Sequence, residues 1–189
     1  MSGRAATTRE RILEKAYERA QAEGVAALDI RSVAKECGVA TGTIYNYFHD
    51  MASLRTEVVR RFWDEAIAQV DLEACSQEGD TVLDYCHRLL QSLGTSLQGF
   101  RTNWLREISA LDARTRQRTQ EAEAACFQSI CDDIRRVIEN DGAISPTARE
   151  RLESGALAQL IWNSIFDSIK QGDHSCQALF DLLDLALYR

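Results

Sequence analysis

The chain has 189 residues, 45% hydrophobic and 27% charged, a globular composition that excludes a disordered chain and argues against a membrane protein. No apolar run approaches the roughly 20 residues of a membrane-spanning helix, and the polar opening Met1–Arg4 is unlike a secretory signal, so we expect a cytoplasmic protein without a membrane partner. The net charge of −7 is unevenly spread, because residues 1–62 carry ten basic and eight acidic side chains. This distribution predicts a mildly basic head on an acidic body.

Helices are predicted from the first periodic segment onward, because the chain holds a single proline and almost no alternating β-branched runs. We therefore expect an all-α fold with about nine helices. Gly24 and Gly38 are expected to end the first two helices, and Asp29, Thr41 and Asp50 are the expected N-caps of the second, third and fourth. The first four predicted helices cover residues 8–23, 30–37, 42–47 and 51–71.

The rest of the chain is predicted to form a larger helical body after a loop over residues 75–80. Pro146 suits the first position of a helix, and Gly142 and Gly172 are natural helix terminators. The predicted helices of this part cover residues 81–98, 103–111, 115–139, 146–172 and 175–188.

The segment IRSVAKECGVATGTIYNYF, residues 30–48, has the spacing of a helix-turn-helix. Ala34 is small where the second helix would cross, and Gly38 follows where the sharp turn favours a positive φ. Five side chains are expected to point inward and join the two helices, namely Val33, Cys37, Val39, Ile44 and Tyr47. The alternative is an ordinary helical hairpin within a bundle, which the spacing alone also permits.

The residues after the turn favour DNA binding, because they place hydroxyls, an amide and a glycine at an exposed helix start. Gly42 permits close approach of a sugar-phosphate backbone, and free amides at a helix start attract anions. Thr43, Tyr45 and Asn46 are expected to reach into the major groove, where Asn can read adenine and Thr can meet a thymine methyl. For Tyr47, packing in the core is the interpretation we favour.

Residues 8–62, and GVATGTIYNYF above all, resemble the DNA-binding head of the tetracycline-repressor (TetR) family. The resemblance implies a DNA-binding domain over residues 1–50 and a ligand-binding and dimerisation domain over 51–189, linked by the helix 51–71. It also implies a transcriptional regulator that needs no cofactor, most often a repressor released from DNA by a small molecule. The residues at positions that the family uses against DNA are Thr41, Gly42, Thr43, Tyr45, Asn46 and Tyr47.

Two positions depart from the family pattern. Asp29 stands where the family often has Thr, and Met51 stands where it usually has Lys at the start of the fourth helix. The missing Lys removes an expected phosphate contact. The cations expected to replace it are Arg4, Arg9, Arg31, Lys35 and His49.

The family resemblance also predicts a small-molecule effector held among the middle helices. Aromatic and aliphatic side chains there are sufficient for an apolar cavity, and simple core packing is the alternative for each of them. The candidate ligand-binding residues are Tyr85, His87, Leu89, Phe100, Trp104, Phe127, Ile130, Ile134, Trp162 and Phe166. Four polar residues are candidates to orient a polar ligand, and exposure to solvent is the alternative for each: Asn103, Arg106, Glu107 and Asn163.

The last two predicted helices carry more apolar surface than one small body needs, which predicts a four-helix interface in a homodimer. A two-fold dimer places two heads about one turn of DNA apart, so the operator is expected to be palindromic double-stranded DNA. The candidate interface residues are Leu157, Leu160, Ile161, Ile165, Leu179, Leu182, Leu183 and Ala186.

Three further classes of protein stay open. We expect no enzyme and no metal site, because His49, His87 and His174 join no catalytic motif and the six cysteines show no C-x-x-C spacing. The sequence still permits a helical adaptor that binds no DNA, an activator with the same head, and a thiol sensor of oxidants. The thiols considered for such a sensor are Cys86, Cys126 and Cys131.

Overall fold

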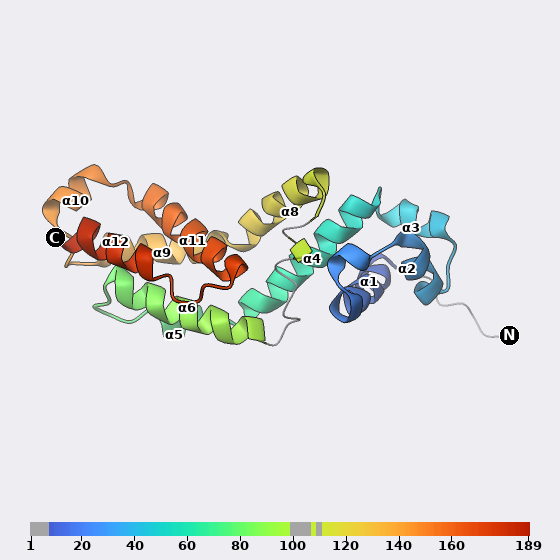
Figure 1. Ribbon diagram of the computed structural model, residues 1–189, viewed down its shortest axis with the longest axis horizontal. Coiled ribbons are helices and arrows are strands. Elements are labelled where there is room, and N and C mark those ends of the chain that lie inside the picture. The colour runs from blue at the N-terminus through green and yellow to red at the C-terminus, as the bar shows by residue number, and fades with distance from the viewer. Residues whose placement is uncertain (1–7, 99–106, 109–110) are drawn as a thin grey trace. The chain divides into compact units, whose positions relative to one another are not determined.

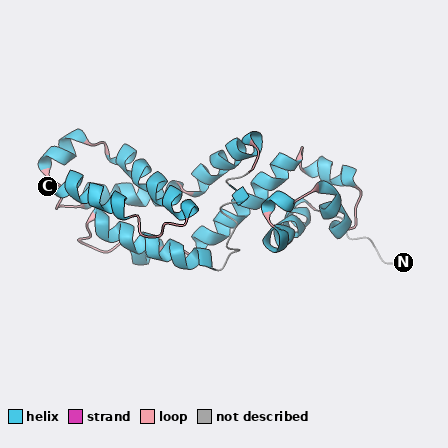
Figure 2. Ribbon diagram, viewed as in Figure 1, coloured by secondary structure: helices cyan, strands magenta, loops and turns pink. Residues whose placement is uncertain are grey.

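The computed structural model describes residues 8–98, 107–108 and 111–189. Within these ranges every regular element is helical, as Figure 2 shows, which confirms the all-α prediction. The same part of the chain contains no helix that is long and apolar enough to cross a membrane. The described residues form two compact units, one within 1–65 and 100–125 and the other within 66–99 and 126–189. The predicted functional division at residue 50 stays a prediction.

The head of the first unit consists of three helices, α1 (Arg9–Glu23), α2 (Ile30–Cys37) and α3 (Thr41–Tyr47), with a 3₁₀ turn at Val25–Ala27 (Figure 1). The Thr8 side chain caps α1 by accepting a hydrogen bond from the Arg11 N–H. Gly24 ends α1 with φ of 101°, a conformation that favours glycine. Buried side chains of α1 pack against α2 and form the core of the head, with Ile12, Ala16 and Ala20 fully covered.

The turn between α2 and α3 confirms the helix-turn-helix prediction. Gly38 has φ of 67°, and the Val39 N–H donates to the Ala34 carbonyl across the turn. Four of the residues expected to face inward, or to be small at the crossing, are buried: Val33, Ala34, Cys37 and Ile44. Two details were wrong: α3 begins at Thr41 with Ala40 at its cap, and Tyr47 is 42% exposed. The helix starts one residue early because Ala40 already has extended backbone geometry and its carbonyl accepts from the Thr43 N–H.

Asp29 is the N-cap of α2, and its carboxylate accepts a hydrogen bond from the Ser32 N–H at 3.0 Å. We expect Asp29→Ala to lower the free energy of unfolding of the head by about 0.5–2 kcal/mol, because a helix N–H loses its acceptor. Denaturant unfolding followed by circular dichroism measures this. Asp29→Asn is the matched control and keeps most of the stability, whereas an equal loss in both variants would contradict a capping role.

The Asp29 cap also leads to a prediction of how the stability of the head depends on pH. Hydrogen bonds from the Ser32 side chain and backbone hold the pKa of Asp29 below its ordinary 3.8. A carboxylate with a lowered pKa in the folded state stabilises the fold above its unfolded pKa, and this contribution is lost as pH falls through the folded pKa. The stability difference between wild type and Asp29→Asn is therefore expected to shrink below about pH 4.

Helix α4 (Met51–Ala68) follows the head and is held to it by side chains of the first unit. Arg55 donates to the carbonyls of Ala26 and Leu28, and the Tyr17 hydroxyl donates to Glu65. The helix ends three residues before the predicted Asp71, because that carboxylate caps the next short helix, α5 (Leu72–Cys75). The predicted loop therefore begins after Cys75, and a buried Cys75 side chain closes α5.

The second unit is built from α6 (Val82–Gln98), α9 (Gln128–Asn140), α10 (Pro146–Arg151), α11 (Ser154–Gln171) and α12 (Gln177–Tyr188). Figure 1 shows α9 beside α11, and this pair makes the most extensive packing contact of the unit. Helix α6 covers α9 and also contacts α12. The core residues at these contacts are aliphatic and aromatic, among them Leu89, Ile130, Ile134, Ile161 and Ile165.

Two long predicted helices are each divided in the structure, so both predictions were wrong. The stretch 115–139 forms α8 (Ala113–Cys126) and α9, with Phe127 between them and packed on Trp162 and Phe166. The stretch 146–172 forms α10 and α11, because the Glu153 carboxylate caps a new helix start at the Gly155 and Ala156 N–H groups. Apolar periodicity does not reveal such an interruption when the helix resumes on the same face.

Two predicted helices remain to be compared with the structure, those over 175–188 and 103–111. Helix α12 begins two residues later than expected, after Cys176 in the left-handed conformation with φ of 49°. The predicted helix over 103–111 lies mostly outside the described residues, and only residues 107, 108 and 111 of it are described.

Candidate functional site

One face of α3 is exposed and rich in hydrogen-bonding groups. Ile44, which is fully buried, anchors α3 to α2, so the opposite face of this short helix points away from the core of the head. Tyr45 is 53% exposed and Asn46 is exposed beside it. A Cβ atom added to Gly42 would meet no atom within 4 Å, so this helix start is open. The structure thus brings together on one small helix all the α3 residues predicted to contact DNA, of which only Thr43 is partly covered: Thr41, Gly42, Thr43, Tyr45, Asn46 and Tyr47.

The predicted cations differ in their surroundings. Arg31 and Lys35 are exposed on α2, and within the described ranges neither side chain forms a salt bridge. His49 is exposed two residues after the end of α3. Arg9 is engaged by its own chain, since its guanidinium lies 5.0 Å from the Phe48 ring centroid and 3.1 Å from the Glu57 carboxylate. Arg4 lies outside the described residues.

The start of α4 carries a charged cluster that the sequence reasoning missed. The Asp50 carboxylate accepts from the Ser53 N–H at 2.7 Å and caps α4. Arg114 and Arg118 of α8 both reach this carboxylate, each with an N–O distance of 3.2 Å. The i, i+4 spacing of the two arginines was visible in the sequence, but their contact with Asp50 joins segments more than sixty residues apart. Hydrogen bonds from the Ser53 side chain and backbone, and more weakly these arginines, hold the pKa of Asp50 below its usual value.

A cleft of about 540 Å³ lies beside this cluster, within the first unit. It is lined by residues of α1, the end of α3, the start of α4 and α8. Arg9, Tyr47, His49 and Arg118 are among its charged and polar lining residues. Thr56 and Ser53 contribute hydroxyls, and the buried Thr56 hydroxyl has no hydrogen-bond partner among the described residues. The cleft therefore joins the end of the exposed α3 face to Arg118 of α8.

The aromatic residues predicted to bind a ligand form part of the core of the second unit. Phe127 lies with its ring centroid 4.8 Å from those of both Trp162 and Phe166, and Ile130 is fully buried. Leu89 and Ile134 are fully covered as well. Mutual ring packing of this kind is typical of a core, so the structure offers no open surface at these side chains.

The remaining predicted ligand residues do not converge. His87 is exposed on α6 and its ring contacts that of Phe180 at a tilt of 38°, with 4.1 Å between ring centroids. Phe100, Trp104, Asn103 and Arg106 lie outside the described residues. Of the two polar candidates that are described, Glu107 accepts from the Val25 N–H of the head at 3.1 Å, and Asn163 is exposed and bonded to Gln159. These contacts differ from the predicted role for Glu107, because its carboxylate is used within the first unit.

Among the candidate ligand-binding residues, Tyr85 has a buried hydroxyl that forms no hydrogen bond with the described residues. The side chain is fully covered on α6, and burial raises the pKa of its hydroxyl. A buried hydroxyl is normally hydrogen-bonded, so this position can meet a polar group that is not among the described residues.

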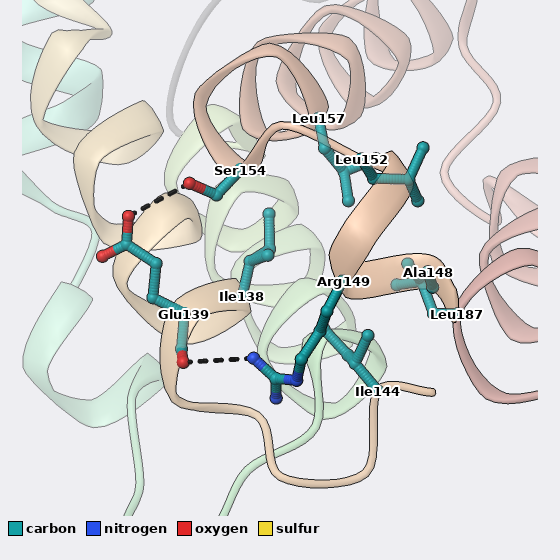
Figure 3. Close-up of a pocket in the computed structure, with 9 residues that line it drawn as sticks. All are labelled: Ile138, Glu139, Ile144, Ala148, Arg149, Leu152, Ser154, Leu157 and Leu187. Atoms are coloured by element: carbon teal, nitrogen blue, oxygen red, sulfur yellow. Dashed lines mark hydrogen bonds between the residues drawn. The ribbon is translucent and has the colours of Figure 1, made fainter. Parts of the chain in front are cut away.

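A pocket of about 240 Å³ is present elsewhere in the second unit, lined by α10 and by the ends of α9, α11 and α12 (Figure 3). Its walls are mostly aliphatic, and Glu139, Arg149 and Ser154 bring polar groups to it. Arg149 donates to the Glu139 carbonyl at 3.4 Å, and the Ser154 hydroxyl donates to the Glu139 carboxylate at 3.0 Å. Sequence reasoning named only Leu157 of this group, as an interface residue. The lining residues are Ile138, Glu139, Ile144, Ala148, Arg149, Leu152, Ser154, Leu157 and Leu187.

Half of the residues predicted at a dimer interface lie in the core of the second unit instead. Leu157, Ile161, Ile165 and Leu183 are buried within the chain, where they pack between α9, α11 and α12. They therefore present little surface to a second copy, and their place at a dimer interface stays a prediction. Leu160, Leu182 and Ala186 are exposed and Leu179 is partly exposed, and Leu185, which was not predicted, is 57% exposed.

The thiols named for an oxidant sensor are mostly covered. Burial raises the pKa of Cys86 to about 12 and raises that of Cys131 as well. Because the thiolate is the reactive form, these two positions have little reactivity near neutral pH. Cys126 is partly exposed at the end of α8.

The head matches a known protein family. Residues 12–58 match the family described as "Bacterial regulatory proteins, tetR family". This range contains α2, the turn and all of α3. No curated protein matches the chain.

Solved structures match the fold over nearly the whole chain. The transcriptional regulator FadR from Bacillus subtilis, in complex with stearoyl-CoA, has a TM-score of 0.61 and 20% identity, covering 95% of this chain and 98% of that one. The multidrug binding protein EbrR, complexed with proflavin, has a TM-score of 0.58 and 21% identity, with 95% and 99% covered. The TetR-family regulator PfmR from Thermus thermophilus has a TM-score of 0.53 and 15% identity, with 98% and 100% covered.

The motif, the exposed α3 face and these matches agree. Residues 12–58 match the model of the tetR family of bacterial regulatory proteins, and the chain shares its fold with solved transcriptional regulators, a TetR-family member among them.

Proposed function

We propose that this protein is a ligand-responsive transcriptional repressor that binds a palindromic operator as a homodimer in the cytoplasm. The observation that carries the proposal is the exposed face of α3, where Tyr45 and Asn46 stand clear of the core while Ile44 holds the helix in place. A hydroxyl, an amide and a threonine methyl on one short helix match the donor, acceptor and methyl pattern of the major groove. Arg31, Lys35 and His49 lie on the elements around α3 and supply the cations that phosphates need.

The small-molecule part of the proposal rests on the second unit and on the relatives. FadR and EbrR were solved with stearoyl-CoA and with proflavin, so proteins of this fold bind organic molecules of quite different shape. In this chain the aliphatic pocket of Figure 3 provides apolar walls, with Arg149 as the cation nearest to it. Its volume of about 240 Å³ is near the lower end for ligand pockets, which favours a small amphipathic molecule.

Selection of binding sites from random duplex DNA with the purified protein tests the function. We expect recovery of a palindrome whose affinity falls steeply between about 50 and 200 mM salt, as phosphate contacts require. The same duplex then serves to screen small molecules for release. Recovery of no sequence at any salt concentration would contradict the proposal and favour a helical adaptor.

The homodimer is tested separately, on the exposed leucines of α11 and α12. Leu160 and Leu182 are 58% and 59% exposed, an unusual exposure for such large apolar side chains. We expect Leu160→Glu combined with Leu182→Glu to change the mass in light scattering from two chains to one, because buried carboxylates oppose association. Asn163→Glu, at an exposed polar position of α11, is the matched control and should stay dimeric. A double variant with the wild-type mass would place the interface elsewhere.

A further inference from the structure

The corner between the end of α3 and the start of α4, at Asp50, is contacted by two arginines from a distant segment of the chain. α4 begins with Met51, which carries no charge, and the arginines that reach Asp50 at this corner come from α8. We propose that Arg114 and Arg118 of α8 form a second contact with the DNA backbone, beside the contact made by α3. This inference rests on the proposed function and extends its DNA-binding surface to a segment outside the helix-turn-helix.

The geometry of Asp50 supports the inference. One carboxylate is shared by two guanidinium groups, with Arg114 at 3.2 Å from one oxygen and Arg118 at 3.2 Å from the other. Arg118 also donates to the Ser53 hydroxyl at 3.1 Å, so its side chain is held toward the start of α4. Two positive groups on a single negative one leave a positive excess at this end of α8.

The arginines also lie next to the residues expected to meet DNA. Asp50 follows His49 directly in the chain, and Arg118 lines the same cleft as His49 and Tyr47. Arg114 is 66% exposed, so most of its guanidinium side chain is open to a second partner. All these residues belong to the first unit, so their arrangement does not depend on the second unit.

The carboxylates near Arg114 and Arg118 determine how far the positively charged surface extends. Glu57 is paired with Arg9 and Arg60, and Asp112 is bonded to the Thr115 backbone and hydroxyl. Glu121 lines the cleft three residues after Arg118. Asp112 and Glu121 keep their negative charge, so the positive surface is confined to the guanidinium groups of Arg114 and Arg118 beside Asp50. A phosphate group is the DNA component that matches these guanidinium groups.

The experiment measures binding of a fluorescent operator duplex, obtained by selection with the wild-type protein, by anisotropy over a series of salt concentrations. Arg114→Ala combined with Arg118→Ala should weaken binding by about tenfold or more at low salt and flatten the plot of log affinity against log salt. The slope is expected to fall by about 0.9 for each phosphate that the variant no longer neutralises. The preferred sequence should not change, because phosphate contacts carry no base information.

Three matched variants separate a phosphate contact from a structural role. Arg114→Lys combined with Arg118→Lys keeps the charge and should keep the salt slope. Arg135→Ala combined with Arg136→Ala removes two exposed arginines from α9 in the second unit and should leave the slope unchanged. Asp50→Asn breaks the ion pairs, keeps a good N-cap and frees the arginines, so it should bind DNA as tightly as wild type or more tightly.

The outcomes distinguish this inference from the proposed function. A wild-type protein that binds no duplex specifically overturns both. Tight wild-type binding with an unchanged salt slope in the double alanine variant overturns the inference alone. Loss of binding in Asp50→Asn equal to that of the alanine variant also overturns it, because the arginines then act by positioning the head.

Discussion

Replacing Trp162 by alanine is expected to lower the free energy of unfolding by about 3–5 kcal/mol, the largest stability effect that we predict. Trp162 is only 2% exposed, and its ring packs on those of Phe127 and Phe166 at centroid distances of 4.8 and 5.8 Å. Removal of the indole leaves a cavity at the junction of α9 and α11, the principal packing contact of the second unit. Chemical denaturation with tryptophan fluorescence and circular dichroism measures the change.

Two controls test the interpretation of Trp162 as a core residue. Leu160→Ala, on the same helix but exposed, should change stability by less than about 0.5 kcal/mol in conditions where the protein is monomeric. Trp162→Phe should recover most of the loss. If Trp162→Ala retained wild-type stability, the cluster would be a loosely packed cavity wall, and the ligand role predicted from the sequence would regain support.

Tyr45→Ala and Asn46→Ala are each expected to weaken binding to the selected operator by about 10- to 100-fold. A good base contact contributes about 1–3 kcal/mol of discrimination, and 1.4 kcal/mol corresponds to a tenfold change. Affinity for unrelated duplexes should change little, because the phosphate-binding cations stay in place. Anisotropy titrations with operator and scrambled duplexes measure both affinities.

The controls for the α3 variants depend on the solvent exposure of the substituted side chains. Tyr45 and Asn46 lie outside the core, so both variants should keep the thermal stability and the mass of the wild type. Gln69→Ala removes an exposed amide remote from α3 in the chain and should bind the operator normally. Wild-type discrimination by both Tyr45→Ala and Asn46→Ala would show that another surface reads the bases.

The head was predictable from sequence because its signals are local. Asp29, Gly38 and the apolar side chains within Ile30–Ile44 act over one or two helical turns, and α2 has the bounds that these residues predict. The exposure of Tyr47 was missed, because an aromatic residue at helical spacing usually indicates a core side chain, and the spacing does not show whether Tyr47 or Phe48 is the buried one. α3 does end at Tyr47, and Phe48 takes the buried position.

The body was less predictable, because its decisive contacts join distant segments. The Trp63 indole N–H donates to the Glu123 carboxylate at 3.0 Å in a buried contact, and Phe127 interrupts a helix to meet Trp162. Apolar periodicity marks the covered face of a helix but does not say which neighbour covers it. For this reason Leu157 and Ile161 were expected at a dimer interface although they pack within the chain.

Arg114 and Arg118 show the same limitation at the candidate site. Three arginines within residues 114–118 look like a solvated helix face when only the sequence is considered. The fold turns two of them toward Asp50, beside the end of α3. A basic surface outside the helix-turn-helix therefore emerges only from the tertiary structure.

The most direct test of the central claim is the ratio of two dissociation constants, measured at one physiological salt concentration. One duplex carries the selected palindrome, and the other has the same length and composition in scrambled order. The exposed face of α3 predicts binding to the palindrome that is tighter by about a thousandfold or more, as specific DNA readers show. Equal dissociation constants for the two duplexes would contradict the account, because the protein would then bind DNA through its charge alone.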